Sequence, residues 1–493
     1  MSDPQAPTPA SPQSDAGAPA SATTGSAHAA TPPIAANTSA LGAVGVTGVE
    51  LQEGRTIPRK QVASWALWDW ATQPFNSVIT TFVFTVYLTS SLFLPADVAA
   101  LDENDPVREA ATADLTSNLG WAVALAGLLI ALLAPVLGQR SDAAGRRKLW
   151  LGISTGLLVL CMFAMFFTTA SASWFWYGAA LVAIGSVFSE IAGVNYNAML
   201  VQVSTPKTIG RISGLGWGLG YLGGIIALGI VVVMQQSGWF GIPTGEGLNI
   251  RLIAVGCGVW AILFSIPLFL NVPEAPPAPG RDRVSFFASY VVLVRDIQRI
   301  WRETRPTFWF LLASAVYRDG LAGVFTFGAI IAARVFGFSD TQVIVFGIAA
   351  NLIAGVSTIA VGRLDDRFGA RAVILGALIG LVAVGLIVFL ARDAGTTVFW
   401  IFGLILCMFV GPAQAASRSF LARVTPAGRE GEIFGLYATT GRAASFLSPA
   451  LWALFIGLFG ATAWGILGIV LVLLAGLVLM FLVKVPAAAS ATR

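Results

Sequence analysis

The chain has 493 residues, of which 56% are hydrophobic and only 11% are charged, and its formal net charge at pH 7 is +4. A soluble protein would carry about a quarter charged residues, so the composition excludes a soluble globular protein. Basic residues fall in short segments between apolar runs, which excludes a nucleic-acid-binding surface. The one histidine, His28, lies in a low-complexity segment, and no cysteines form a CxxC pair. We therefore expect neither an enzyme nor a metal or cofactor.

The first segment, residues 1–60, is predicted to be a disordered cytoplasmic tail. Residues 1–49 are rich in Ala, Pro, Ser, Thr and Gly and contain no Lys or Arg. They lack the basic region and the compact apolar core of a signal peptide, and their composition is typical of disorder. A role in binding or regulation and no role at all are both left open.

Apolar segments of about 20 residues, the length of a helix that crosses a bilayer, recur along the rest of the chain. Helices are expected because every backbone amide in lipid must be satisfied within its own segment. We predict an all-α membrane protein with twelve transmembrane helices. Their approximate limits are 68–94, 119–138, 149–169, 174–200, 214–235, 251–270, 307–333, 341–361, 372–391, 397–417, 435–458 and 462–483.

Lysine and arginine are distributed unevenly between the two sides of these spans. Of the 29 basic residues, 23 lie on the side of the N-terminus, including Arg418 directly after the tenth span, and four lie on the opposite side. The loop 95–118 on that opposite side carries six acidic residues and one arginine. The positive-inside rule then predicts a multi-pass protein of the plasma (inner) membrane with both termini in the cytoplasm.

An internal repeat follows the second and the eighth span at an offset of 224 residues. Each copy has a Gly, an Asp four residues on, a Gly seven residues on and then basic residues: Gly138, Asp142, Gly145 and Arg146 in the first, and Gly362, Asp366, Gly369 and Arg371 in the second. The stretch 210–214 matches 431–435 in the same way, at an offset of 221. We predict two pseudo-symmetric six-helix halves in parallel orientation, residues 61–270 and 307–485, with a C-terminal tail over 486–493.

A cytoplasmic linker over 271–306 is expected to join the halves. It opens with the helix-breaking stretch VPEAPPAPG, and apolar residues then recur at helical spacing: Phe286, Tyr290, Leu293, Ile297 and Ile300. This pattern predicts an amphipathic helix on the membrane surface.

The residues of the repeated loops suit a conformational latch rather than a substrate site. Gly138 lets two helices approach closely, and Asp142 can accept hydrogen bonds from backbone amides at a helix start. The arginines can meet helix C-termini and carboxylates of the other half. Such bonds must break when the halves move apart.

Two such loops, in twelve spans with a basic central linker, resemble the major facilitator superfamily over residues 60–485. Three stretches resemble one branch of it: WALWDWATQPF at 65–75, YRDGL at 317–321 and QAASRSFLARVTP at 414–426. This branch contains the autophagy-related vacuole effluxers of fungi and bacterial relatives of unknown substrate. The resemblance implies a secondary transporter and, for the fungal members, efflux of amino acids. Arg318 departs from the neutral residue usual at its position, which leaves the substrate chemistry open.

Five ionisable residues lie in or at the edge of the predicted spans: Asp69, Glu190, Arg318, Asp319 and Arg442. Each is costly in lipid and is therefore a functional candidate. If Glu190 lacks a partner across the cavity, desolvation would suit it to carry a proton. Arg318 or Arg442 would then bind a substrate carboxylate, and fixed ion pairs between helices are the alternative.

Two neutral residues join the candidates, and one motif does not. Asn197 shares a helix face with Glu190, and Tyr317 precedes Arg318. The GxGxxG pattern at 218–223 lies within an apolar span without a preceding strand, so it predicts close helix packing rather than dinucleotide binding.

Asp69 lies between two tryptophans, and its depth decides its role. If the helix starts near Pro74, Trp65, Trp68 and Trp70 form an aromatic belt at the membrane surface and Asp69 favours a helix N-terminus. If the helix starts near Ser64, Asp69 lies about two turns inside and faces the cytoplasmic mouth of a cavity, where it would act in gating.

Taken together, these features predict a secondary active transporter. We expect a monomer in the lipid bilayer that moves a small polar solute, such as an amino acid, outward by alternating access with proton coupling. A drug or sugar exporter and a non-transporting membrane sensor or scaffold stay open as alternatives.

Overall fold

The computed structural model describes residues 49–102, 105–274, 285–338, 340–459 and 461–484. Residues 45–493 form one compact unit. Of the predicted tail, residues 1–48 lie outside the described residues, and the predicted C-terminal tail does so as well. Residues 49–60 contain a 3-10 turn, Glu50–Gln52, and the start of the first α-helix at Arg59.

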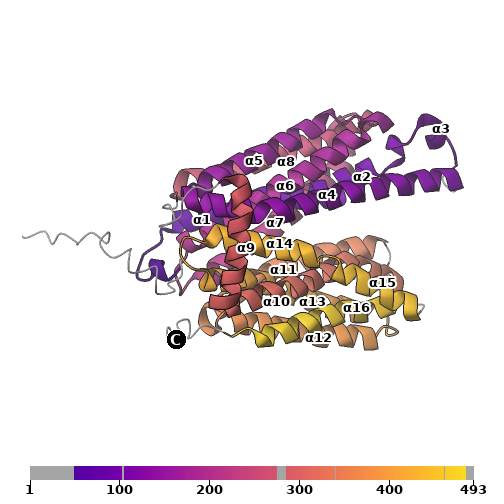
Figure 1. Cartoon of the computed structure of the whole chain (residues 1–493). Helices are drawn as coiled ribbons and strands as arrows, with labels where there is room; N and C mark the ends of the chain where they lie inside the picture. Colours follow the sequence, from indigo (N-terminus) through magenta and orange to yellow (C-terminus); the bar gives the residue numbers. More distant parts are fainter. Residues whose placement is uncertain (1–48, 103–104, 275–284, 339, 460, 485–493) are drawn as a thin grey trace, which may run out of the picture. The chain divides into compact units, whose positions relative to one another are not determined.

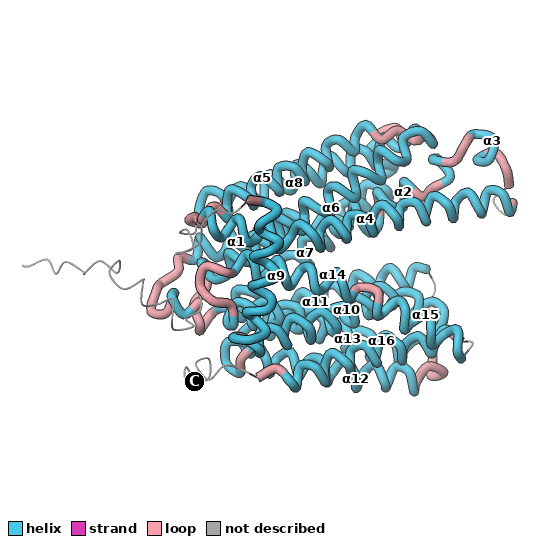
Figure 2. Tube along the Cα trace, in the orientation of Figure 1, coloured by secondary structure: helices cyan, strands magenta, loops and turns pink. Residues whose placement is uncertain are grey.

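All regular structure in the described ranges is helical (Figure 2). We call α1 to α8 the N-half: α1 (Arg59–Pro74), the π-helix η4 (Phe75–Phe82), α2 (Phe84–Leu88), α3 (Ala96–Ala99), α4 (Pro106–Ala144), α5 (Arg147–Ala164), α6 (Phe175–Ala198), α7 (Ile209–Gln236) and α8 (Leu248–Asn271). We call α10 to α16 the C-half: α10 (Arg305–Ile330), the π-helix η11 (Ile331–Val335), α11 (Asp340–Phe368), α12 (Ala370–Leu390), α13 (Thr396–Val424), α14 (Glu430–Ala444), α15 (Leu447–Phe459) and α16 (Gly465–Leu482).

Ten helices in the described part of the chain are long and apolar enough to cross a membrane. The first and the eleventh predicted spans do not qualify because each is interrupted. Span 1 changes to π-helix directly after Pro74 and then breaks at Val83, whose φ is −121° and ψ −63°. Span 11 is split between α14, which ends at Ala444, and α15, which starts at Leu447. Ten continuous and two broken spans are consistent with twelve.

The helix α9 (Phe286–Glu303) lies between the halves in the sequence and crosses other helices in Figure 1. Ser285 caps its start, since the Ser285 hydroxyl accepts a hydrogen bond from the backbone of Ala288. The helix contacts α4 and α10, and the Tyr290 hydroxyl donates to the carbonyl oxygen of Leu132 at 3.3 Å. Ile300 is buried, whereas Val291 is exposed. The helix thus packs one face on both halves and leaves another free.

The two halves approach most closely where glycines from the repeats face each other. A Cβ on Gly138 of α4 would lie 2.1 Å from the carbonyl oxygen of Gly431 in α14. At the second repeat, a Cβ on Gly362 of α11 would lie 2.9 Å from the Cα of Arg211 in α7. Only hydrogen fits at these contacts, so backbones can pack directly. The GxGxxG stretch also serves packing, because Gly218 lies against the side chain of Ile359.

Candidate functional site

The first repeated loop binds the start of a helix in the C-half. Gly145, with φ +59°, ends α4 in a left-handed turn. The buried carboxylate of Asp142 accepts hydrogen bonds from the backbone amides of Gly431 and Glu432 in the first turn of α14, both at 3.0 Å. Arg147 completes the contact, since it bonds Asp142 at 2.7 Å and Glu430 at 2.6 Å. This is the helix-start contact predicted from the sequence.

The second loop makes the same contact in the opposite direction. Asp366 near the end of α11 accepts from the backbone amides of Gly210 and Arg211 in the first turn of α7, at 2.7 and 2.9 Å. Gly369, with φ +85°, separates α11 from α12. Each half therefore contributes one aspartate and one helix start. We call the end of the unit that carries these two contacts the closed end.

In the first copy the predicted basic residue is the wrong one of two neighbours, whereas in the second copy Arg371 meets a helix C-terminus, as expected, but within its own half. Arg146 is exposed, and its neighbour Arg147 enters the contact instead. Arg371 donates to the carbonyl oxygen of Phe481 within the C-half, at 3.2 Å. Arg423 of α13 takes its place and pairs with Asp366 at 3.5 Å and with the adjacent Asp365. Arg146 lies just before α5 in a non-helical conformation, whereas Arg147 is the first residue of that helix and faces the C-half.

Asp69 lies deep enough to face protein rather than a membrane surface. Its helix starts at Arg59, ten residues earlier, or roughly 15 Å at 1.5 Å per residue. The carboxylate accepts from the hydroxyl of Tyr196 at 3.0 Å and pairs with Arg418 at 3.2 Å. The alternative of an aromatic belt is wrong for Trp65 and Trp68, which are 0% and 3% exposed and stack on the Tyr196 ring.

Arg418 is the centre of this cluster, and its sequence-based placement after the tenth span is wrong. The helix α13 continues to Val424, so Arg418 lies inside it, and its side chain is only 4% exposed. The guanidinium donates to three helices of the N-half: to Asp69 of α1, to Asn197 of α6 at 2.9 Å, and to the hydroxyl and carbonyl of Ser213 in α7 at 3.0 and 2.6 Å. We call Arg418, Asp69, Tyr196, Asn197 and Ser213 the gate cluster.

The gate cluster joins the halves next to the two latches. Its one cation and one carboxylate are partnered by hydroxyl, amide and carbonyl groups, as a buried pair requires. The Arg418 guanidinium also lies 5.1 Å from the ring centroid of Trp65 and 5.7 Å from that of Tyr196. Asn197, expected in the substrate site, belongs to this cluster instead. Asp69 is a gating candidate from the sequence alone, whereas the motif QAASRSFLARVTP was the only sign of Arg418.

Glu190 has a partner across the interface. From the sequence it is expected to carry a proton only if it has no such partner. Arg442 of α14 donates to it at 3.1 Å, and the two side chains are 30% and 44% exposed. Arg442 lies twelve residues into α14, roughly 18 Å from its start at the closed end. Among the described residues, this is the ion pair between the halves that lies farthest from the closed end.

Arg318 of α10 contacts an aromatic ring and a carbonyl oxygen rather than a carboxylate among the described residues. Its guanidinium lies 3.9 Å from the ring centroid of Tyr437 and donates to the carbonyl oxygen of that residue at 3.0 Å. Gly441 leaves room for it, because a Cβ there would lie 2.9 Å from the guanidinium. Within the described part of the chain no Asp or Glu comes within ion-pair distance of Arg318.

Asp319 and Tyr317, expected beside Arg318 in the substrate site, hold helices together. Asp319 accepts from the backbone amide of Ser448 in the first turn of α15 and so caps the second part of the broken span 11. The hydroxyls of Tyr317 and Ser417 share a hydrogen bond between α10 and α13. Both residues are buried. Arg318 and Asp319 do not pair with each other, as their positions on the helix predicted.

Two helical halves that exchange aspartate-to-helix-start contacts form the fold of the major facilitator superfamily, and solved structures share this fold. The human organic anion transporter MFSD10 superposes with a TM-score of 0.65 over 86% of this chain and 99% of its own, at 16% identity. The proton:xylose symporter XylE superposes with a TM-score of 0.66 over 86% of this chain and 95% of its own, at 14% identity. At these identities the likeness shows the fold alone.

Within that superfamily the chain belongs to the family described as Vacuole effluxer Atg22 like, whose model matches residues 58–492. The MFS-type transporter YxiO of Bacillus subtilis is 27% identical over 428 residues, which cover 85% of this chain and 94% of that protein. Autophagy-related protein 22 of Cryptococcus neoformans is 26% identical over 289 residues, 54% of this chain and 49% of that protein. The match thus spans about half the length of this fungal relative. The chain is a multi-pass transporter and not an enzyme.

Proposed function

We propose that this protein is a secondary active transporter that exports a small solute bearing a carboxylate, such as an amino acid. The observation that carries the proposal is Arg318, a guanidinium in a membrane span with no carboxylate partner among the residues described. It lies 13 residues after the start of α10, or roughly 20 Å along the helix. A charge at such depth is costly, and an anionic substrate would offset that cost when bound.

The pair formed by Glu190 and Arg442 supports proton coupling by a route different from an unpaired carboxylate. The Glu190 carboxylate could exchange Arg442 for the ammonium group of a bound amino acid. A proton taken up by Glu190 would remove its charge and release that group. Proton and substrate thus compete for Glu190, as an exporter that exchanges substrate for protons requires.

Alternating access supplies the conformational part of the proposal. The two latches and the gate cluster hold the halves together at the closed end, and their bonds would have to break when that end opens. We propose that the closed end faces the cytoplasm of a plasma (inner) membrane, because the basic residues gather on that side. The family description as an effluxer favours export. We further propose that one copy of the chain suffices, since each half already finds its partner within the chain.

The test is transport by the purified protein in liposomes, offered amino acids, sugars and cationic dyes with and without a proton gradient. We expect proton-driven movement of an amino acid or another small carboxylate, lost in Arg318→Ala. Arg367→Gln changes an exposed arginine of α11 and serves as the control. If the protein transports only a neutral sugar or a dye, the proposal that its substrate bears a carboxylate is refuted. A protein that binds amino acids but moves nothing would point to a sensor.

A further inference from the structure

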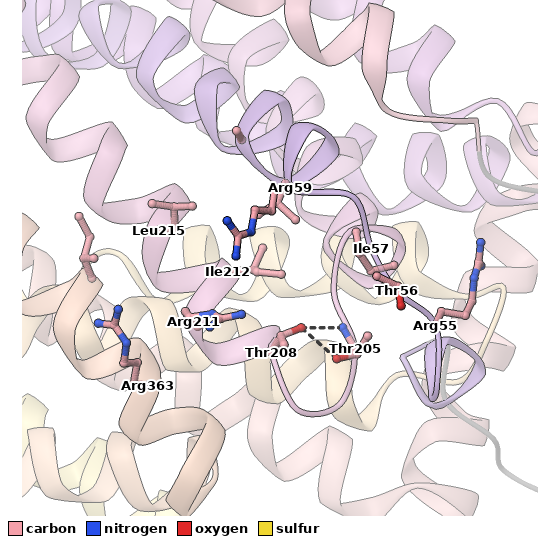
Figure 3. A pocket seen from close by; sticks show the side chains of 13 residues that line it. Arg55, Thr56, Ile57, Arg59, Thr205, Thr208, Arg211, Ile212, Leu215 and Arg363 are labelled. Carbon is pink, nitrogen blue, oxygen red and sulfur yellow. Dashed lines mark hydrogen bonds between the residues drawn. The ribbon is translucent and has the colours of Figure 1, made fainter.

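A cavity of about 550 Å³ lies at the closed end, apart from the residues proposed to bind substrate (Figure 3). Its walls come from the segments before α1 and α7, the first two turns of these helices, and the last third of α11. The size is within the range of small-molecule sites in proteins. None of these walls is part of the pair Glu190–Arg442 or of the Arg318 site.

The charged side chains that line this cavity are all arginines: Arg55, Arg59, Arg211 and Arg363. No Asp or Glu lines it. The guanidinium groups of Arg59, Arg211 and Arg363 make no hydrogen bond or ion pair within the described ranges, and Arg55 bonds only Gln52, at 2.6 Å. Unpaired cations around one cavity repel each other, so an anion inside would be stabilised.

The polar and apolar groups that line the cavity indicate which chemical class of anion would fit. The hydroxyls of Thr205 and Thr208 bond each other at 3.0 Å at one side of it. Ile57, Ile212, Leu215 and Ile359 line other parts. The planar guanidinium group of arginine can donate two parallel hydrogen bonds to the oxygens of one phosphate. A phosphate ester, which joins such oxygens to an organic group, matches both the arginines and the apolar wall.

The cavity also lies across the contact between the halves. Arg59 and Arg211 belong to α1 and α7 of the N-half, whereas Arg363 belongs to α11 of the C-half. Next to it, Asp366 of α11 binds the backbone amides of Gly210 and Arg211. An occupant that bonds arginines of both halves would be lost when α7 and α11 separate. It would therefore favour the conformation in which they touch.

We propose that this cavity binds a phosphate ester, and that its occupant holds the N-half and the C-half together at the closed end. The ester can be the headgroup of an anionic phospholipid or a soluble metabolite, because both present the same oxygens. This is a regulatory site separate from transport of the carboxylate, and its test does not need the transported substrate.

The test uses the full chain in nanodiscs of phosphatidylcholine. One arm adds 10% phosphatidic acid to the disc, because basic residues are attracted to anionic lipid. The other arm adds glycerol 3-phosphate to the buffer. Spin labels on Arg146→Cys and Phe368→Cys, both exposed and in different halves, report separation of the closed end. The native cysteines are buried and leave these positions selective. Binding is measured in parallel by calorimetry or by native mass spectrometry.

We expect either phosphatidic acid or glycerol 3-phosphate to bind. The distribution of distances between the two spin labels should then become a single population at short distance. Arg59→Gln/Arg363→Gln should weaken binding by at least about a hundredfold, since hydrogen bonds to charged groups are each worth roughly tenfold or more. Arg363→Lys, which keeps the charge but cannot donate two parallel hydrogen bonds, should weaken it about tenfold and guards against misfolding of the double variant. Arg367→Gln, on the same helix but outside the cavity, should behave as the unmodified protein.

Each outcome decides the matter. A response to phosphatidic acid alone assigns the site to lipid, and a response to glycerol 3-phosphate alone assigns it to a soluble ester. Equal binding by the unmodified protein and the double variant, or no binding of either probe, overturns the site. Binding without any change in label distance overturns the role in holding the halves together.

Discussion

The gate cluster gives the sharpest prediction, because one side chain of the C-half bonds three helices of the N-half. Arg418→Gln removes the charge paired with Asp69 at 3.2 Å and three further hydrogen bonds, to Asn197 and to both oxygens of Ser213. Loss of one partner from a buried pair costs about 3–5 kcal/mol. The Asp69 side chain is 22% exposed, so partial hydration brings the expected cost to about 3 kcal/mol.

That cost falls on the conformation with the closed end shut, since the bonds exist only while the halves touch. A shift of about 3 kcal/mol changes the ratio of shut to open molecules roughly a hundredfold. Distances between spin labels on Arg146→Cys and Phe368→Cys would move from short to long in Arg418→Gln. The double variant Arg418→Gln/Asp69→Asn should be less perturbed than the sum of the single ones, because the buried carboxylate is then neutral.

The reasoning fails if Arg418→Gln leaves the label distances unchanged while the protein stays folded. It also fails if the effects of the two substitutions are simply additive, because the pair would then not be coupled.

Three further outcomes are expected from other contacts. Gly138→Ala should open the closed end and lower the melting temperature, at a cost of about 2 kcal/mol, because the new Cβ would lie 2.1 Å from the Gly431 oxygen; Gly156→Ala, with no atom within 4 Å, is the matched control. Asp319→Ala should lower thermal stability by about 1 kcal/mol through loss of the cap on Ser448 while leaving substrate affinity unchanged, and a loss of affinity at full stability would contradict this. Glu190→Gln should abolish accumulation driven by a proton gradient but keep substrate exchange in liposomes, and full proton-driven accumulation would rule out coupling at this residue.

The latches could be predicted from the sequence because their information is local and repeated. The spacing of Gly138 and Asp142, copied at Gly362 and Asp366, identified both the close approach and the acceptor of helix-start amides. Which of two adjacent arginines enters the contact could not be predicted. Arg146 and Arg147 are adjacent and chemically identical, one just before α5 and one at its first position, and the position of the other half decides between them.

Within the gate cluster, Asp69 was a gating candidate from the sequence, but the role of Arg418 was not predicted, for a different reason. Hydropathy ends the tenth span at residue 417, because Arg418 and the polar residues after it lower the average. The helix nevertheless continues to Val424, since its amides are satisfied within the helix whatever its side chains contact. Arg418 is stable there because Asp69, Asn197 and Ser213 surround it, and these come from segments more than 200 residues away.

The partners that side chains find across the interface between the halves could not be predicted from the sequence either. Glu190 and Arg442 are 252 residues apart in the chain, so no local pattern joins them. The role of Asp319 as a cap depends on the break between α14 and α15, which a continuous apolar run does not reveal.

The exchanged latches also bear on how such a molecule could arise. Asp142 of the N-half meets the start of α14, and Asp366 of the C-half meets the corresponding start of α7. A two-fold axis would relate such contacts in a homodimer, where the same surface of each subunit meets its copy. A single six-helix chain carrying one aspartate loop and one such helix start could therefore have closed by self-association before duplication and fusion placed both copies in one polypeptide.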